Sequence, residues 1–239
     1  MAGWRDRPPW LERGEDSGLE SGAMGVEAKA GGGRTGREPA VLLALAAGAL
    51  VASGIFPHDR VTWWLEVAPV LLGAPILVAT YRRFPLTPLV YRLLFLHALV
   101  LILGGHYTYA RVPLGFWVAD ALDLARNHYD RLGHFAQGFV PALLAREILL
   151  RRTPLVRGAW LTFLVLAVCL GFSAFYELTE WWAALAGGQA AEAFLGTQGD
   201  VWDTQWDMFL ALLGAITAQL ALSRVHDRQL ARLATSSRA

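Results

Sequence analysis

The residues of this chain that are suited to acid–base or metal chemistry gather at the ends of a few apolar segments. One stretch, RNHYDRLGHFAQ at residues 126–137, holds two histidines, an aspartate and two arginines where an apolar segment of membrane length begins. Ionisable side chains are costly in hydrocarbon, so a cluster at the mouth of a membrane helix indicates a functional site.

Three segments each carry polar residues at helical spacing. The three sets are Asp130, His134 and Gln137; Ser173, Glu177 and Glu180; and Asp200, Asp203 and Asp207. Residues three, four and seven positions apart share one face of a helix. Because charges that face lipid are disfavoured, we expect the three faces to turn towards one another and form a polar pocket that opens to the outer side of the membrane.

A divalent metal ion is the cofactor that this set of residues would suit, because imidazole and carboxylate groups together bind zinc, manganese and similar ions. The chain has no His-Glu-x-x-His motif, so the interpretation depends on bringing separate helices together. We assign the metal ligands as His106, His128, Glu180, Asp200 and Asp207. We assign catalytic roles to His134, Asp130, Glu177 and Asp203. We assign substrate binding to Arg126, Arg131, Tyr129 and Gln137.

Two other interpretations of the same residues stay open. In the first, His134 is the titrating group of metal-free acid–base chemistry, and Asp130 or Glu177 orients it. In the second, Arg126 and Arg131 pair with the acidic residues of the later segments, and the buried ion pairs only fix how the helices pack.

The composition predicts that membrane helices position these residues. Of the 239 residues, 55% are hydrophobic and 17% are charged, and the mean hydropathy is +0.38. A membrane helix needs about 20 mostly apolar residues. Six segments approach that length, and they lie at residues 40–56, 65–81, 88–105, 129–150, 158–183 and 205–223. The predicted fold is therefore an all-α, polytopic membrane protein with about six transmembrane helices.

The charge pattern predicts the orientation of these helices. If the N-terminus is cytoplasmic, 17 of the 21 Lys and Arg residues fall in cytoplasmic regions, as the positive-inside rule requires. We expect a disordered cytoplasmic tail at 1–38, a membrane domain at 39–224 and a cytoplasmic tail at 225–239. Seven tryptophans fall at the outer ends of the segments, where indole rings favour the headgroup region. The net charge of +1 gives no sign of nucleic-acid binding.

Some polar residues lie outside the three sets. Glu66 is interpreted as either a further contributor to the pocket or an interfacial residue, and His97 as a hydrogen-bonding group between helices. We place His226 in the cytoplasmic tail and interpret Glu147 as a local helix charge. The single cysteine, Cys169, excludes an internal disulfide and a cysteine-based zinc site.

The chain resembles the YjdF-type family of bacterial inner-membrane proteins. The resemblance covers about residues 40–224, and four motifs carry it: GHYTY at 105–109, RNHYDRLGH at 126–134, YELTEW at 176–181 and GTQGDVWDTQWDM at 196–208. The resemblance implies a multi-pass protein of the bacterial inner membrane. Because the family is named for its location, the resemblance implies no particular activity.

A weaker similarity is to VanZ-like membrane proteins, in which an Asp-Lys-x-x-His motif precedes a glutamate and then an aspartate on later helices. Asp130 to His134, Glu177 and Asp203 fall in the same order. Arg131 stands where that pattern has lysine, and Asp207 where it tends to have asparagine. The similarity implies a substrate in the cell envelope or one linked to a lipid.

The leading functional hypothesis from the sequence is a metal-assisted hydrolase or transferase that acts on a lipid or an envelope-linked substrate, with membrane lipids as its surroundings. The alternatives are a proton-coupled transporter or small-ligand binding protein, and a structural or assembly protein of the membrane. A transporter needs polar groups that continue to the cytoplasmic side, and the inner halves of the last three predicted spans are nearly all apolar.

Overall fold

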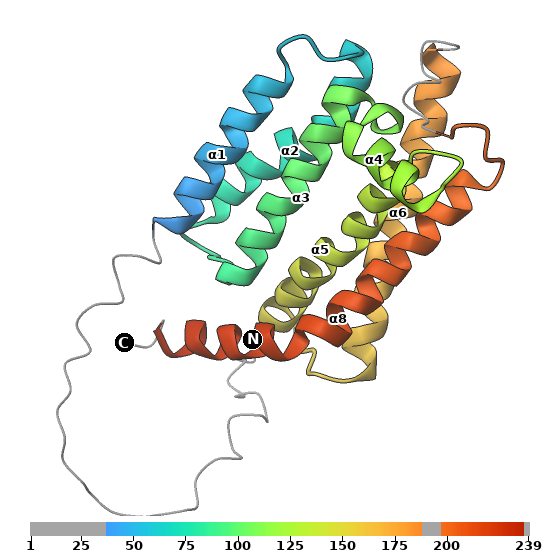
Figure 1. The fold of residues 1–239 in the computed structure, drawn as a ribbon. Helices are drawn as coiled ribbons and strands as arrows, with labels where there is room; N and C mark the ends of the chain where they lie inside the picture. Colours follow the sequence, from blue (N-terminus) through green and yellow to red (C-terminus); the bar gives the residue numbers. More distant parts are fainter. Residues whose placement is uncertain (1–36, 188–196, 237–239) are drawn as a thin grey trace, which may run out of the picture.

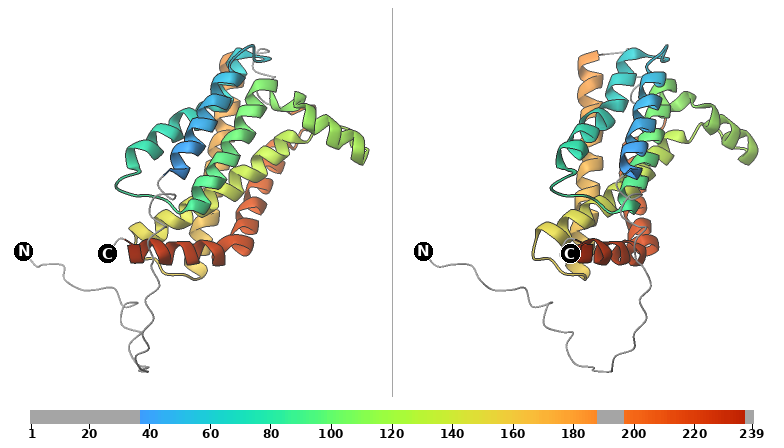
Figure 2. Two further views of the ribbon diagram at one scale, coloured as in Figure 1. Left: turned by 60° about the vertical axis from the view of Figure 1, so that its left-hand side comes forward. Right: turned by 90° about the vertical axis from the view of Figure 1, so that its left-hand side faces the viewer.

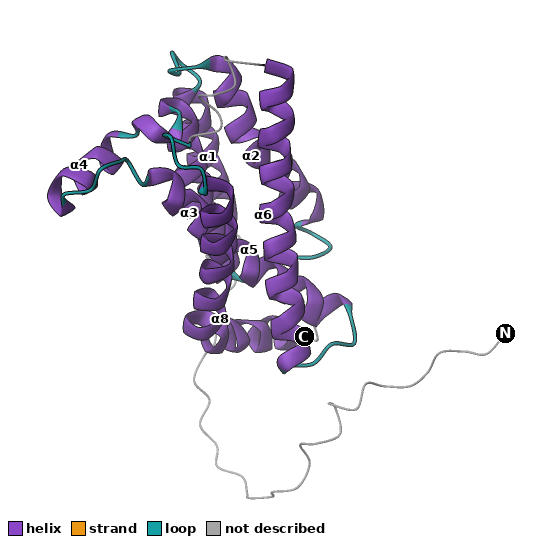
Figure 3. Ribbon diagram, turned by 90° about the vertical axis from the view of Figure 1, so that its right-hand side faces the viewer, coloured by secondary structure: helices purple, strands orange, loops and turns teal. Residues whose placement is uncertain are grey.

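The computed structural model describes residues 37–187 and 197–236, and these ranges contain helices and loops but no strand (Figures 1 and 3). The α-helices are α1 (Glu38–Ser53), α2 (Arg60–Thr80), α3 (Pro88–Tyr107), α4 (Pro113–Leu122), α5 (Tyr129–Arg152), α6 (Ala159–Gly187) and α8 (Asp203–Ser236). A single 3-10 turn, η2 (Tyr109–Arg111), joins α3 to α4.

Each of the six predicted segments coincides with one of the long helices, and the all-α membrane architecture predicted from the sequence is confirmed. Four helices, α2, α3, α6 and α8, are long and apolar enough to cross a membrane, and α1 is a shorter apolar helix. Helix α5 is 24 residues long but carries many charges. The number of spans and the cytoplasmic position of both ends stay predictions.

Helix α5 lies at the centre of the bundle, where α3, α6 and α8 pack against it, while α1 and α2 pack on α3 (Figure 1). Of these helix pairs, α5 and α8 approach each other most closely, because glycines lie where the two helices touch. A Cβ atom on Gly138 would lie 1.7 Å from the Ala211 carbonyl oxygen, and one on Gly214 would lie 2.1 Å from the Phe135 carbonyl oxygen. Small residues allow two membrane helices to approach backbone to backbone.

Tyr109 holds α3 against the first turns of α5. Thr108 adopts a left-handed conformation (φ 57°) that ends α3 and turns the chain into η2. The Tyr109 ring then lies so close to two glycines that a Cβ on Gly104 or Gly133 would come within 2.2 Å or 2.7 Å of it. Glycine at both positions lets the ring fit between the two helices.

The segment between α3 and α5 contains the short helix α4. This helix projects sideways from the bundle (Figures 2 and 3) and exposes large apolar side chains, among them Phe116 and Trp117. Its position fits an interfacial helix.

Helix α8 is longer than predicted, because it continues well past residue 223 and its last turns run across the end of the bundle (Figure 1). The region expected to be a cytoplasmic tail from residue 225 is therefore helical as far as Ser236. The expected tail at 1–38 falls outside the described residues except for its last two positions.

This course of α8 creates a second buried polar cluster, and it corrects the interpretation of Glu147 as a local charge. Glu147 and His226 are both fully buried. The His226 Nε2 lies 3.0 Å from Glu147 Oε2, and the backbone N–H and hydroxyl of Thr87 also donate to that carboxylate. Arg146 donates to His226 Nδ1. These contacts join α3, α5 and α8 at the end of the bundle opposite to α4.

Candidate metal centre

His134 lies at the centre of the largest group of buried acids in the described residues. Its side chain is 5% exposed. Three carboxylates from three helices surround the ring: Asp130 of α5, Glu177 of α6 and Asp207 of α8. The three polar faces expected from the sequence are thus brought together in the structure.

Close packing of α5 on α8 accounts for the pairing of His134 with Asp207. Gly138 and Ala211 touch at the helix crossing, and His134 and Asp207 each lie four residues before one of them. Residues four apart share a helix face, so the two side chains meet one turn away from the crossing. On α6, Ser173, Glu177 and Glu180 are all buried and follow the same spacing.

The distances around His134 Nε2 are longer than hydrogen bonds. Nε2 lies 3.5 Å from Asp130 Oδ1 and 3.8 Å from Asp207 Oδ2. Two ligands of one tetrahedral ion with bonds of about 2.1 Å are separated by about 3.4 Å. The spacing of these three atoms therefore fits ligands of a shared divalent ion better than direct hydrogen bonds.

Gln137 decides which nitrogen of His134 is available to a metal. The Gln137 Oε1 lies 2.8 Å from His134 Nδ1. An amide oxygen can only accept a hydrogen bond, so His134 Nδ1 carries a proton and donates it to Gln137. The lone pair is then on Nε2, which faces Asp130 and Asp207. Such a hydrogen bond on the remote ring nitrogen is typical of metal-binding histidines.

Two buried carboxylate oxygens beside His134 lack a hydrogen-bond partner among the described residues. They are Glu177 Oε1 and Asp207 Oδ1, on residues that are 8% and 2% exposed. Buried polar atoms in proteins are nearly always hydrogen-bonded, so each exception requires an explanation such as an ion. A cation held by Asp130, His134 and Asp207 would satisfy Asp207 Oδ1.

Two overlapping sets of three residues in the described chain are close enough to hold an ion. One is Asp130, His134 and Asp207, and the other is His134, Glu177 and Glu180; within each set the ligand atoms lie within 4.8 Å of one another. The tautomer imposed by Gln137 favours the first set, because the second would use the protonated Nδ1.

An arginine layer covers the site at the end nearer α4. Arg126 donates to Asp200 at 3.3 Å and to Asp203 at 3.0 Å, and Arg131 donates to Asp200 at 2.8 Å. The Arg131 guanidinium also lies 5.3 Å from the centre of the Trp206 ring. Asp200 and Asp203 are therefore arginine partners in the structure, and neither belongs to the two ligand sets.

His128 lies beside the arginine layer and outside both ligand sets. Partial burial, followed by the nearby charges of Arg131 and Arg126, lowers the pKa of His128. The Nε atoms of Arg126 and Arg131 are buried and have no hydrogen-bond partner among the described residues, so they are donors available to an anion.

Two further residues assigned from the sequence make structural contacts. The Nδ1 of His106 lies 2.7 Å from the Ser53 carbonyl oxygen, which holds α1 against α3. The Tyr129 hydroxyl donates to the Val100 carbonyl at 3.0 Å, and the ring packs against Tyr109. The structure therefore does not bring His106 into the metal set, and it does not present Tyr129 to a substrate.

The sequence did not decide whether Glu66 of α2 belongs to the site. Its side chain is 5% exposed, and the Tyr176 hydroxyl donates to Glu66 Oε2 at 3.1 Å. A Cβ on Gly105 would lie 3.2 Å from Glu66 Cβ, so the glycine of the GHYTY motif makes room for this acid. Tyr176 stands one residue before Glu177, so α2 is connected to the site through α6.

Gln198 is a residue that sequence reasoning did not single out. Its side-chain amide accepts from the backbone N–H of Asn127 at 3.2 Å and donates to the Asn127 carbonyl at 2.8 Å. Asn127 in turn donates to the Val112 carbonyl at 2.9 Å. This double contact ties the segment before α8 to the segment before α5, and it holds the arginine layer over the acids. Gln198 lies inside the GTQGD motif, and this position is the sequence feature that could have identified it.

Comparison with known proteins agrees with the architecture. Residues 38–228 match a family model described as "Predicted membrane protein (DUF2238)". The chain is 59% identical over 183 residues to the inner membrane protein YjdF of Escherichia coli strain K12, a match that covers 77% of this chain and 88% of that protein. No solved structure matches the chain. The similarity to VanZ-like proteins is not addressed by these matches and stays a prediction.

Proposed function

Since this chain belongs to the DUF2238 family of predicted membrane proteins, similar to an inner membrane protein, we propose that it is a metal-assisted hydrolase or transferase that acts within the membrane on a lipid or an envelope-linked substrate. The metal would be held by Asp130, His134 and Asp207. The observation that carries the proposal is the unpartnered, buried carboxylate oxygen of Asp207 beside a histidine whose Nε2 is left as an acceptor.

Charge balance supports a cation at this place. Glu66, Asp130, Glu177, Glu180 and Asp207 are buried around one imidazole, while Arg126 and Arg131 are occupied by Asp200 and Asp203. Unpaired carboxylates are costly in a medium of low dielectric constant. A divalent ion would offset part of that cost, and it favours the ionised form of the ligands.

The other residues would supply the remaining parts of a hydrolytic or transfer reaction. A bound divalent metal would lower the pKa of a coordinated water, to about 7 in the case of zinc, and would polarise a phosphoryl or carbonyl oxygen. Glu177 and Glu180 are the carboxylates placed to take a proton from the nucleophile. Arg126 and Arg131 would contact an anionic headgroup through their Nε atoms, which have no hydrogen-bond partner among the described residues, while their terminal nitrogens stay paired with Asp200 and Asp203.

The alternative of a proton relay across the membrane is less well supported by the packing. The second polar cluster begins at Arg146, nine residues after Gln137 along α5, which is about 13 Å of helix. Between them lie fully buried apolar side chains such as Ala142, Leu143, Val165 and Ala215. These core side chains offer no titratable group that could pass a proton between the two clusters.

Elemental analysis of the purified protein tests the proposal. We expect about one divalent ion per chain in the wild type and its loss in Asp207→Asn and His134→Ala. Asp120→Asn is the matched control, because Asp120 is exposed on α4 and this variant should keep the ion. Turnover of phosphatidylethanolamine and phosphatidylglycerol vesicles, followed by lipid mass spectrometry, should be lost with the metal. A metal-free preparation that still turned over these lipids would contradict the metal-dependent mechanism.

A further inference from the structure

A long cavity of about 1410 Å³ lies among α1, α2, α3, α5 and α6. Along α2 its lining runs from Leu65 to Ala79, which is about 21 Å at 1.5 Å per residue, and it continues to Arg82 and Arg83 just beyond the helix. The hydrocarbon core of a bilayer is about 30 Å thick. Pockets for small molecules usually measure about 300–1,000 Å³. The cavity is therefore larger than a small-molecule site, and it is longer than the half of the hydrocarbon core that one acyl chain spans.

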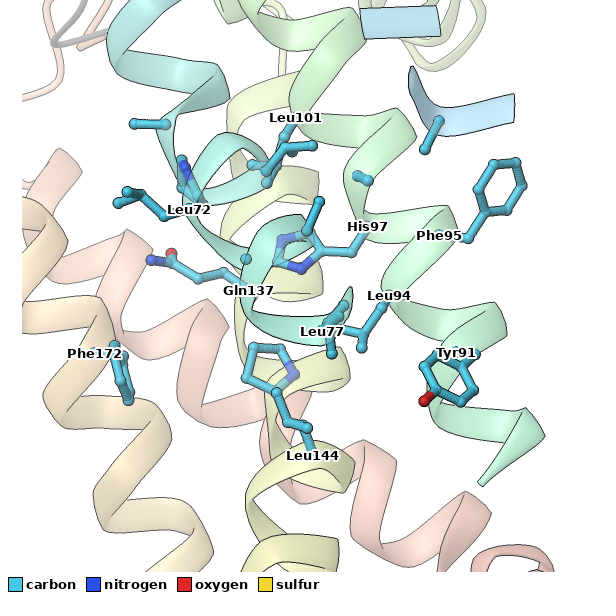
Figure 4. Close-up of a pocket in the computed structure, with 18 of the residues that line it drawn as sticks. Leu72, Leu77, Tyr91, Leu94, Phe95, His97, Leu101, Gln137, Leu144 and Phe172 are labelled. Carbon is cyan, nitrogen blue, oxygen red and sulfur yellow. The ribbon is translucent and has the colours of Figure 1, made fainter. Parts of the chain in front are cut away.

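The wall of the cavity is apolar over most of its length. Figure 4 shows leucines of α2, α3 and α5, such as Leu72, Leu94 and Leu144, together with Phe172 of α6 around the space. Water is not stable in a cavity lined by hydrocarbon. A hydrocarbon chain from the surrounding bilayer is the occupant that such a wall accommodates.

The polar atoms of the lining are concentrated at the two ends. One end is formed by Glu66, Asp130, His134 and Glu180, which belong to the candidate metal centre, and the other by Arg82 and Arg83. A molecule with a polar head and a long apolar chain matches this distribution, with the head at one polar end and the chain directed along α2.

His97 adds one hydrogen-bonding group to the apolar wall. Its ring points into the lined space in Figure 4, and its Nε2 is buried and has no hydrogen-bond partner among the described residues. His97 lies eight residues before Gly105 on α3, which is about 12 Å along the helix from the level of Glu66. An oxygen atom on the occupant, such as an ester carbonyl, would satisfy this nitrogen.

From these observations we infer that the cavity is a binding site for a glycerophospholipid, with an ester-linked acyl chain along α2 and the phosphate-bearing head at the acidic end. The position of the head rests on the proposed function, because a phosphate needs a metal ion among these carboxylates. Binding of the acyl chain of the lipid depends only on the apolar cavity. A glycerophospholipid would then be the class of substrate on which the metal centre acts.

Two glycines provide a matched pair of variants. A Cβ on Gly73 or on Gly171 would meet nothing within 4 Å, so a side chain can start at either position without backbone displacement. Gly73 lines the cavity, whereas Gly171 is exposed on α6 and does not line it. Gly73→Phe therefore fills the cavity, and Gly171→Phe enlarges a lipid-facing surface by the same group.

The test is photo-labelling of the full-length protein in bilayers that contain a phosphatidylethanolamine with a diazirine in its acyl chain. In the wild type, labelled peptides should include cavity residues of α2 and α3. Labelling there should fall about tenfold in Gly73→Phe and stay unchanged in Gly171→Phe, because displacing even two methylenes of the chain loses that much affinity. His97→Leu should reduce cavity labelling, and His97→Gln should restore it.

Equal cavity labelling in the two glycine variants would overturn the inference, as would labelling confined to exposed residues such as Trp160 and Phe163. Labelling by a photoactivatable polyprenyl phosphate but not by the phospholipid would overturn the assignment to a glycerophospholipid. Metal content is measured on the same samples. Cavity labelling without metal would refute the proposed function alone, and metal without cavity labelling would refute this inference alone.

Discussion

Replacing Gly138 by alanine should separate α5 from α8 and empty the metal centre. The added Cβ would lie 1.7 Å from the Ala211 carbonyl oxygen, and Cβ atoms essentially never approach another atom within 3.0 Å. Relief of this overlap requires a shift of about 1.3 Å between the two backbones. Because the contact is with backbone, no side-chain rotation can supply that shift.

The same shift has a calculable effect on the ligands. His134 Nε2 and Asp207 Oδ2 are 3.8 Å apart, so a further 1.3 Å would place them roughly 5.1 Å apart. Two ligands on opposite sides of one ion with bonds of about 2.2 Å are separated by at most about 4.4 Å. The pair could then no longer bind one ion, and metal content should fall. Overpacking of this kind costs about 1–3 kcal/mol of stability.

Gly171→Ala is the control for the intrinsic effect of the substitution. Alanine in a helix is favoured over glycine by about 0.8–1 kcal/mol, and a Cβ at Gly171 meets nothing. This variant should be as stable as the wild type or slightly more stable, with full metal content. Thermal unfolding in detergent, followed by tryptophan fluorescence, and elemental analysis of the same sample measure both effects.

The reasoning would be refuted if Gly138→Ala unfolded at the same temperature as Gly171→Ala and retained its metal. A destabilised Gly138→Ala protein with full metal content would show that the ligands do not come from both α5 and α8.

Two other predictions concern the groups around the site and the opposite end of the bundle. Gln137→Leu should weaken metal binding about 10–100-fold, because the Nδ1–H of His134 loses its acceptor. Gln137→Glu keeps an acceptor and should bind metal well, and equal metal affinity in both variants would contradict the role of this hydrogen bond. Glu147→Leu should lower the free energy of unfolding by about 3–5 kcal/mol, since it removes one partner of a buried, charged network with Thr87 and His226. Metal content should not change in Glu147→Leu, and an unfolding temperature equal to that of Asp120→Asn would contradict the prediction.

The sequence by itself determined the class of fold and the approximate position of every long helix. Hydropathy over about 20 residues is a local property, and bilayer thickness converts it directly into helices. Helical spacing likewise determined that Asp130 and His134 share a face, and that Glu177 and Glu180 do. These residues are close in the chain, so the helix alone positions them.

Tertiary structure decided which of the many acids and histidines meet. From sequence, His106 and His128 were assigned as metal ligands and His134 as a catalytic residue, but the ring of His106 contacts the Ser53 carbonyl and that of His128 lies beside the arginines. Gln137 was assigned to substrate and instead contacts His134. Contacts of this kind depend on the rotation of whole helices, which no local pattern encodes.

The end of α8 shows the same limit more clearly. The sequence indicated that polar residues follow the last apolar segment, which fits a solvent-exposed tail. Only the bend of α8 across the bundle brings His226 to Glu147, 79 residues away in the chain, and buries both. Hydropathy determined where this chain is helical, whereas the glycine contacts between α5 and α8 and the course of α8 decided which charges are buried together.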